Sequence, residues 1–185
     1  MFALALLLAA PSAMAYPNRW NIGAGMGDVE LLYGRFGDHE IYVGCHPPDN
    51  SVSMSIGLVA PAAERRGPRA GIMVVTLANR ELRLAGRIED GRVEVEIPGS
   101  RFLNGNGQEL IRTTVDPTRT LHSLYVDGER RAEIDQFTEL LTSNEGAPLT
   151  IQIEGEPRVY RLGANARVRS ARSIREACPP GRRTS

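Results

Sequence analysis

The sequence predicts an α+β domain, built as a mainly antiparallel β-sheet or open barrel of about nine strands with two helices in its C-terminal half. Three observations predict this fold class. Short runs of alternating apolar and polar residues dominate the chain, turns rich in Gly, Pro, Asn and Asp separate them, and helical apolar spacing occurs only late. The 185 residues suit one domain with a single core.

The first 15 residues have the pattern of a secretory signal peptide. Phe2 to Ala10 is an unbroken apolar run, and Ala13-Met14-Ala15 supplies a small-x-small cleavage pattern. The run is shorter than the ~20 residues that cross a bilayer, and no Lys or Arg precedes it. We expect cleavage between Ala15 and Tyr16, a β-rich domain over 16–178 and a disordered tail over 179–185. A buried N-terminal strand or helix is the alternative.

Cys45 and Cys178 are the two cysteines of the chain. In an exported protein, two distant cysteines predict one structural disulfide, and two free thiols are the alternative. A bridge over so long a loop would stabilise the fold by roughly 5 kcal/mol in the chain-entropy model. This disulfide would join the strand that ends at Cys45 to the last helix.

Four strands are predicted in the first half of the chain. Ser51 to Val59 alternates apolar and polar residues, which is typical of a half-buried strand, and Gly71 to Ala78 is apolar throughout. Pro61 to Arg69, with two Pro, one Gly and four charges, is expected to be an exposed loop. Gly23 to Gly27 is expected to be a flexible lead-in. The four strands cover 28–33, 39–45, 51–59 and 71–78.

Two further strand pairs are predicted from turn signals. Glu89-Asp90-Gly91 stands between alternating runs, and Asp-Gly in that position predicts a β-hairpin because both residues tolerate positive φ. Asp116-Pro117 is interpreted as the turn between strands 110–115 and 120–126. Asn104 to Gly107 is another predicted turn.

The last part of the chain combines one hairpin with two helices. Ile134, Phe137, Leu140 and Leu141 share one face of a helix expected over 131–143. Strands 149–153 and 159–162 form a hairpin around Gly155. A second helix is predicted from one apolar stripe, which is made of Val168, Ala171, Ile174 and Cys178.

The charge is balanced overall but unevenly distributed. All 22 basic residues are Arg, against 22 acids, and the zero net charge argues against a generic nucleic-acid binder. Residues 158–185 hold eight Arg and one acid, whereas residues 16–157 have a net charge of −7. The last helix therefore offers a patch for an anionic partner, although neutralisation against the protein's own acidic sheet is the favoured alternative. The patch comprises Arg167, Arg169, Arg172 and Arg175.

No metal or cofactor is predicted. His39, Cys45 and His46 invite a zinc interpretation, but only His122 remains as a fourth ligand, and an oxidised Cys45 cannot bind metal. The glycines at 23–27 have the wrong spacing for a phosphate loop. The polar segment 104–109 lacks the spacing of a calcium loop.

No catalytic residue is predicted either. His122 and Ser123 are neighbours in an expected strand, so their side chains point to opposite faces. Glu94 and Glu96 alternate with apolar residues and are interpreted as a solvated strand face, not as a glycosidase pair.

An early Trp, a Cys closing one of the first strands, and a C-terminal hairpin followed by a helix ending in Cys form a recognisable outline. Its elements are Trp20, Ile41–Cys45, Phe137 with Leu140 and Leu141, Val159–Gly163 and Ile174–Cys178. In this outline the chain resembles a broad set of small bacterial periplasmic proteins, including the invasion-associated locus B proteins and the accessory periplasmic proteins of type VI secretion gene clusters. The resemblance implies a disulfide-closed β-rich fold and a non-enzymatic role, without active-site residues. The second internal Cys pair of some relatives is absent.

The expected function is that of a periplasmic or secreted binding or accessory protein, with another envelope protein or a cell-wall component as its partner. The first alternative is an inhibitor of a cell-wall hydrolase that inserts an exposed loop, either Pro61 to Arg69 or Pro98 to Gly107. The second alternative is a hydrolase that uses a carboxylate pair or His122.

Overall fold

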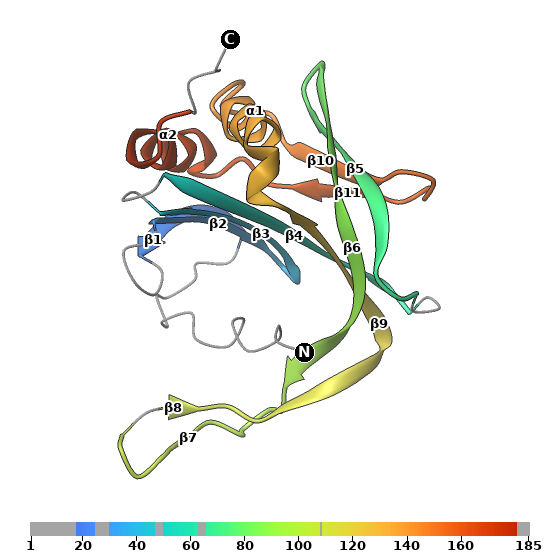
Figure 1. Cartoon of the computed structure of the whole chain (residues 1–185). Coiled ribbons are helices and arrows are strands. Elements are labelled where there is room, and N and C mark those ends of the chain that lie inside the picture. Colours follow the sequence, from blue (N-terminus) through green and yellow to red (C-terminus); the bar gives the residue numbers. More distant parts are fainter. Residues whose placement is uncertain (1–17, 25–29, 47–49, 63–65, 108, 181–185) are drawn as a thin grey trace.

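A computed structural model of the chain describes residues 18–24, 30–46, 50–62, 66–107 and 109–180. In this part of the chain, nine strands form one antiparallel sheet in the order β1-β2-β3-β4-β9-β6-β5-β10-β11, which curls into an open half-barrel (Figure 1). The sheet confirms the predicted fold class. Its strands are β1 (Arg19–Ala24), β2 (Glu30–Phe36), β3 (His39–His46), β4 (Ser51–Pro61), β5 (Arg69–Leu77), β6 (Arg80–Glu96), β9 (Thr113–Val126), β10 (Leu149–Ile153) and β11 (Val159–Leu162).

Side-chain alternation places one face of the curled sheet in the core. In β3 and β4 every second residue is buried, as the alternating sequence predicts. The neighbouring strands continue the same face, with Met73 of β5 and Leu84 of β6 directly opposite one another. The inward residues of β3 and β4 are Ile41, Val43, Cys45, Met54, Ile56, Leu58 and Ala60.

Two helices cover the inner face of the sheet. A 3₁₀ turn (Gly128–Arg130) leads into α1 (Arg131–Leu141), which packs on β4 and β6, and α2 (Arg167–Ala177) packs on β1, β2 and α1 (Figure 1). Both helices bury the apolar stripes that the sequence predicts. No helix in the described ranges has the length and apolar character needed to cross a membrane. The buried apolar residues of the helices are Ile134, Phe137, Leu140, Leu141, Val168, Ala171 and Ile174.

The predicted disulfide is confirmed. Cys45, near the end of β3, is bonded to Cys178, which follows the last turn of α2, with 6.0 Å between the Cα atoms. Both residues are at least 95% buried. The bond spans 133 residues and ties the terminal helix to the N-terminal half of the sheet.

Trp20 of β1 binds the segment that connects β11 to α2. Its backbone N–H donates to the Asn165 carbonyl oxygen at 3.0 Å, and its indole N–H donates to the Gly163 carbonyl oxygen at 3.0 Å. The buried ring packs edge-to-face on Phe36 at 5.5 Å. Gly34 makes room for it, since a Cβ at that position would lie 2.9 Å from the Trp20 ring. These contacts fix the β11–α2 connection against the first strand of the sheet.

The predicted hairpin turn at Asp90-Gly91 is wrong, because β6 runs through it without a break. The Asp90 side chain is 1% exposed and is held by His122 and Arg69, so a buried ion pair fixes the dipeptide inside a strand. The chain reverses instead at Ala78-Asn79, between β5 and β6, where Ala78 takes a positive φ of 54°.

The predicted turn at Asp116-Pro117 is also wrong, because both residues lie within β9. The Asp116 carboxylate accepts a hydrogen bond from the Thr118 N–H at 2.9 Å and pairs with Arg119 at 2.6 Å. The register between β6 and β9 shifts at Arg92/Val93, so residues 117–119 have no partner on β6. The segment expected to be a turn thus forms a β-bulge on β9 in place of a chain reversal.

The lead-in expected over 23–27 is wrong for its first two residues, because Gly23 and Ala24 end strand β1. Residues 25–27 lie outside the described residues. The same holds for the expected signal peptide, with its cleavage site at Ala15 and Tyr16, and for most of the expected tail.

Candidate functional site

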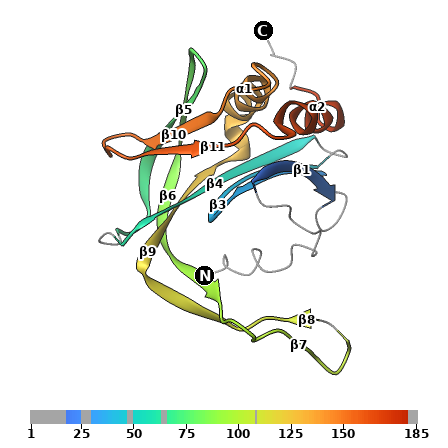
Figure 2. The ribbon, with the colours of Figure 1, turned by 180° about the vertical axis from the view of Figure 1, so that it is seen from behind.

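A two-stranded arm extends from the sheet. Strand β5 ends its pairing with β6 at Ile88, and β4 ends its pairing with β9 at Arg119. Beyond these points β6 and β9 pair only with each other, as far as Glu96 and Thr113. Figures 1 and 2 show this ribbon leaving the body of the molecule and ending in the small strands β7 (Phe102–Leu103) and β8 (Glu109–Leu110).

The tip of the arm, residues 97–112, exposes a group of large apolar side chains. It holds five of the seven large apolar side chains that are exposed in the described part of the chain. Leu103 is the most exposed of them, at 69%. An apolar group of this kind at the end of a projecting element is typical of an interaction site. The five residues are Ile97, Phe102, Leu103, Leu110 and Ile111.

The charged residues of the arm tip are paired with one another. Arg101 donates two hydrogen bonds to Glu96, at 2.8 and 2.9 Å, and also lies near Glu109. The Arg112 guanidinium lies over the Phe102 ring at 5.4 Å, and the Arg112 backbone pairs with the Ser100 hydroxyl. Arg101 is thus neutralised within the tip, and the exposed apolar side chains are the main surface that the tip offers to a partner.

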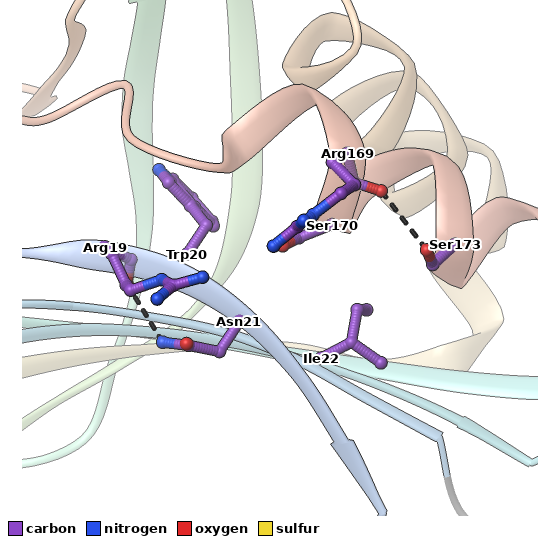
Figure 3. Close-up of a pocket in the computed structure, with 7 residues that line it drawn as sticks. All are labelled: Arg19, Trp20, Asn21, Ile22, Arg169, Ser170 and Ser173. Atoms are coloured by element: carbon purple, nitrogen blue, oxygen red, sulfur yellow. Dashed lines mark hydrogen bonds between the residues drawn. The ribbon is translucent and has the colours of Figure 1, made fainter. Parts of the chain in front are cut away.

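A second candidate site is a cavity of about 220 Å³ between β1 and α2. Figure 3 shows Arg19 and Arg169 reaching into it from the two elements, with the Ser170 and Ser173 side chains on the helix side. Asn21 donates to the Arg19 carbonyl oxygen, and the Ser173 hydroxyl donates to the Arg169 carbonyl oxygen. The cavity thus collects two guanidinium groups and several small polar groups. Its described lining is completed by Trp20 and Ile22.

The predicted anionic-partner patch on α2 is smaller than expected, because Arg167 is completely buried. Its guanidinium donates to the backbone carbonyls that follow α1, including Leu141 at 3.2 Å and Ser143 at 3.0 Å. The Asn144 and Ala147 carbonyls accept its remaining hydrogen bonds. Burial lowers the pKa of Arg167, whereas the charge of Glu145 raises it. Arg167 is therefore a structural residue that fixes the α1–β10 connection.

The other three arginines of the patch differ in exposure. Arg169 and Arg172 are exposed, while Arg175 is half-buried and donates to the Asp135 carbonyl oxygen at 3.1 Å. Arg169 lines the cavity between β1 and α2, and Arg172 does not. The structure thus associates one member of the patch with Arg19, which the sequence reasoning did not select.

His122 forms a buried pair with Asp90, through Nδ1 and Oδ1 at 2.7 Å. Burial acts to raise the pKa of Asp90, but hydrogen bonds from His122, the Arg66 backbone N–H and Arg69 together hold it below its usual value. Both side chains are at most 5% exposed. The geometry resembles half of a catalytic triad, but a catalytic base must reach a substrate. His122 lies in the core face of β9, opposite Leu58 and Asp90.

The residues considered as metal ligands in the sequence have other roles in the structure. Cys45 is oxidised to a disulfide, and His39 accepts a hydrogen bond from the Val59 N–H at its Nδ1 atom. Among the described residues, no three His, Cys, Asp or Glu side chains are grouped as metal ligands. The Glu94 carboxylate accepts a hydrogen bond from the Thr113 hydroxyl, and the Glu96 carboxylate accepts hydrogen bonds from Arg101. Both acids that the sequence analysis considered as a glycosidase pair therefore belong to the arm.

The sequence predicts Pro98 to Gly107 as an exposed loop and Arg169 as part of a patch, but it identifies neither the apolar group of the arm tip nor Arg19. The apolar residues around the Asn104–Gly107 turn carried the signal for the arm tip, since they flank a polar turn without matching any core face. Arg19 carried no such signal, because its proximity to α2 follows from the contacts of Trp20 with the β11–α2 connection.

Comparisons of the chain with protein-family models, curated proteins and solved structures found no match. The function is therefore argued from the geometry of the two sites.

Proposed function

We propose that the chain is an exported, non-enzymatic binding or accessory protein of the bacterial envelope, which holds a partner protein through the tip of its β6–β9 arm. The observation that carries the proposal is the gathering of exposed apolar side chains on this tip. Single exposed apolar residues are common on protein surfaces, but groups of them at a projecting end mark contact sites.

The arm also has the physical character of an element that is completed by a partner. An isolated two-stranded ribbon is marginally stable in water. Among the described residues, neither edge of this one has a strand partner beyond Ile88 and Thr118, whose carbonyl oxygen accepts from the Ala62 N–H. Such edges accept a further strand from a partner protein. Phe102 and Leu110 are direct partners across β7 and β8 and share one face, so burying them together in an apolar cleft would contribute about 3 kcal/mol. A protein with an apolar cleft or a free strand edge is the partner that fits.

Export is supported by two features of different kinds. The signal-peptide pattern lies at the start of the sequence, and the Cys45–Cys178 bond belongs to the oxidising compartments in which structural disulfides persist. The periplasm or the extracellular space is therefore the proposed location.

The second candidate function is inhibition of a cell-wall hydrolase. The segment Pro98 to Gly107, which the sequence offered as a plug for an active site, lies at the tip of the arm. The other offered loop is less suited, because the Arg66 N–H and Arg69 are bonded to Asp90. The hydrolase alternative has no comparable support, because His122 is buried in the core.

Site-specific photo-cross-linking in the native envelope tests the leading proposal. A photoreactive residue at Leu103 is compared with one at Val159, which is 57% exposed but belongs to β11. We expect a discrete protein adduct at position 103 that is absent at 159 and disappears with Phe102→Asp. Equal adducts at both positions, or none at 103, would contradict the proposal.

An inhibition assay separates the two candidate functions. Inhibition of lysozyme or another cell-wall hydrolase at micromolar protein, lost in Phe102→Asp, would assign the arm to an enzyme cleft. Absence of inhibition across a panel of such enzymes would remove the inhibitor candidate.

A further inference from the structure

The cavity between β1 and α2 has the composition of a small anion site. Its described lining residues comprise two arginines, two serines, one asparagine and two apolar residues, without a carboxylate among them. At about 220 Å³ it is smaller than the ~300–1,000 Å³ pockets that enclose drug-sized molecules. A site of this size suits one ionic group better than a whole metabolite.

The position of Arg169 is unfavourable for the helix alone. Arg169 lies in the first turn of α2, which contains no acidic residue. The positive end of the helix dipole is located there, so a cation in this turn is destabilising and an anion is favoured. Arg169 forms no ion pair with any carboxylate in the described part of the chain.

Arg19 adds a second positive charge from a different element. It lines the same cavity from β1, which is an edge strand paired only with β2. Two guanidinium groups on the lining of one cavity give it a positive potential, which favours an anion there.

The donors also converge from several directions. In an antiparallel strand, backbone N–H groups alternate between the two edges. The Trp20 N–H points away from β2, towards Asn165, so the N–H of Ile22 points to the same free edge, where the cavity lies. The Ser170 hydroxyl adds a further polar group on the helix side.

From this geometry we propose that the cavity between β1 and α2 binds a phosphate group, held between Arg19 and Arg169. A tetrahedral oxyanion accepts hydrogen bonds from several directions, whereas a planar carboxylate is satisfied by a single guanidinium fork. The site is separate from the arm, so it stands independently of the arm's proposed role. The phosphate is either free, as in a soluble phosphoester, or carried by a lipid headgroup.

Titration of the full-length mature protein with inorganic phosphate tests the site, with binding followed by calorimetry at constant ionic strength. We expect saturable binding that weakens roughly tenfold or more in Arg19→Gln and in Arg169→Gln, because each change removes charge-assisted hydrogen bonds. Arg172→Gln is the matched control, since Arg172 is exposed on the same helix but does not line the cavity. Its affinity should stay within twofold of the wild type.

Two further binding experiments identify the source of the phosphate. Flotation with phosphatidylglycerol vesicles, against phosphatidylcholine vesicles, detects a lipid headgroup, and titration with glycerol phosphate detects a soluble phosphoester. Binding in either experiment that is weakened by Arg19→Gln and by Arg169→Gln supports the site. The proposal is overturned by absence of saturable binding to all three probes, by equal affinity for acetate, or by an equal loss in Arg172→Gln. Far-ultraviolet circular dichroism of each variant checks that it is folded.

Discussion

At the scale of single residues, the buried polar groups of this protein have distinct energetic roles. Arg167 spans the end of α1 and the start of β10 because its guanidinium bonds four backbone carbonyls. Buried carbonyls that lose their donors are costly, at about 1–3 kcal/mol for each unsatisfied group. A single side chain thus adds to the capping of α1, whose Glu139 and Leu140 carbonyls already accept hydrogen bonds from Thr142 and Ser143.

Arg167→Met keeps the length of the side chain and removes every donor. We expect the free energy of unfolding to fall by about 2–4 kcal/mol, measured by urea denaturation. Arg172→Met on the exposed side of the same helix should change it by no more than about 0.5 kcal/mol. A loss of that small size for Arg167→Met would contradict the structural role.

Tyr160, unlike Arg167, has a buried polar group that lowers stability. Its hydroxyl is buried and has no hydrogen-bond partner among the described residues, and burial raises its pKa. Tyr160→Phe should therefore raise the free energy of unfolding by about 1 kcal/mol, because an unsatisfied buried hydroxyl is removed. In contrast, Tyr42→Phe should lower it slightly, since the Tyr42 hydroxyl donates to Glu40 at 2.9 Å. A destabilised Tyr160→Phe would show that the hydroxyl has a partner.

Asp90 makes stability depend on pH. Its pKa is lowered below the ordinary value of 3.8 in the folded protein, so its stabilising contribution is present above that value and is lost as the pH falls through the folded-state pKa. Asp90→Asn should be less stable than the wild type at pH 7, and the difference should narrow below about pH 3.8. Urea denaturation of both proteins at several pH values measures this, and a constant difference down to about pH 2 would contradict it.

At the scale of elements, local apolar patterns predicted more than turn signals did. The stripe from Val168 to Cys178 predicted α2 because its helical period matches the face that packs on the core. Asp90-Gly91 and Asp116-Pro117 misled because a turn signal is a local preference, and buried pairing across β6 and β9 overrides it. The arm was hidden for the same reason, since two expected hairpins are in fact one long ribbon.

The arm is an addition to the core and not a part of it. Val93 and Asp116 are direct partners across the ribbon, so an Asn-Gly turn in place of residues 94–115 closes a two-residue hairpin at that pair. We expect this shortened chain to fold, with a free energy of unfolding within about 1 kcal/mol of the wild type. Failure of the shortened chain to fold would show that the arm belongs to the core.

At the scale of the whole molecule, two long-range connections hold the fold together. Trp20 joins β1 to the segment that connects β11 to α2, and the Cys45–Cys178 bond fixes α2 to β3. The sequence predicted the bond from the compartment and the count of cysteines. It could not predict the contacts of Trp20 or the cavity of Arg19 and Arg169, because both depend on how far the sheet curls.

Removing the disulfide should weaken the fold without changing it. The double variant Cys45→Ala/Cys178→Ala should lose about 2–5 kcal/mol of unfolding free energy, and reduction of the wild type should give a similar loss. Denaturation with and without reductant measures both. Equal stability of the oxidised and reduced proteins would contradict the role assigned to the bond.

The most direct test of the central claim is the size of the native complex in envelope extracts, measured by sedimentation for the wild type and for the chain with residues 94–115 replaced. We expect the wild type in a complex that is larger than its monomer and contains a different protein, while the purified wild type and the shortened chain sediment as monomers. A shortened chain that still sediments in the full-size complex would contradict the claim that the arm holds the partner.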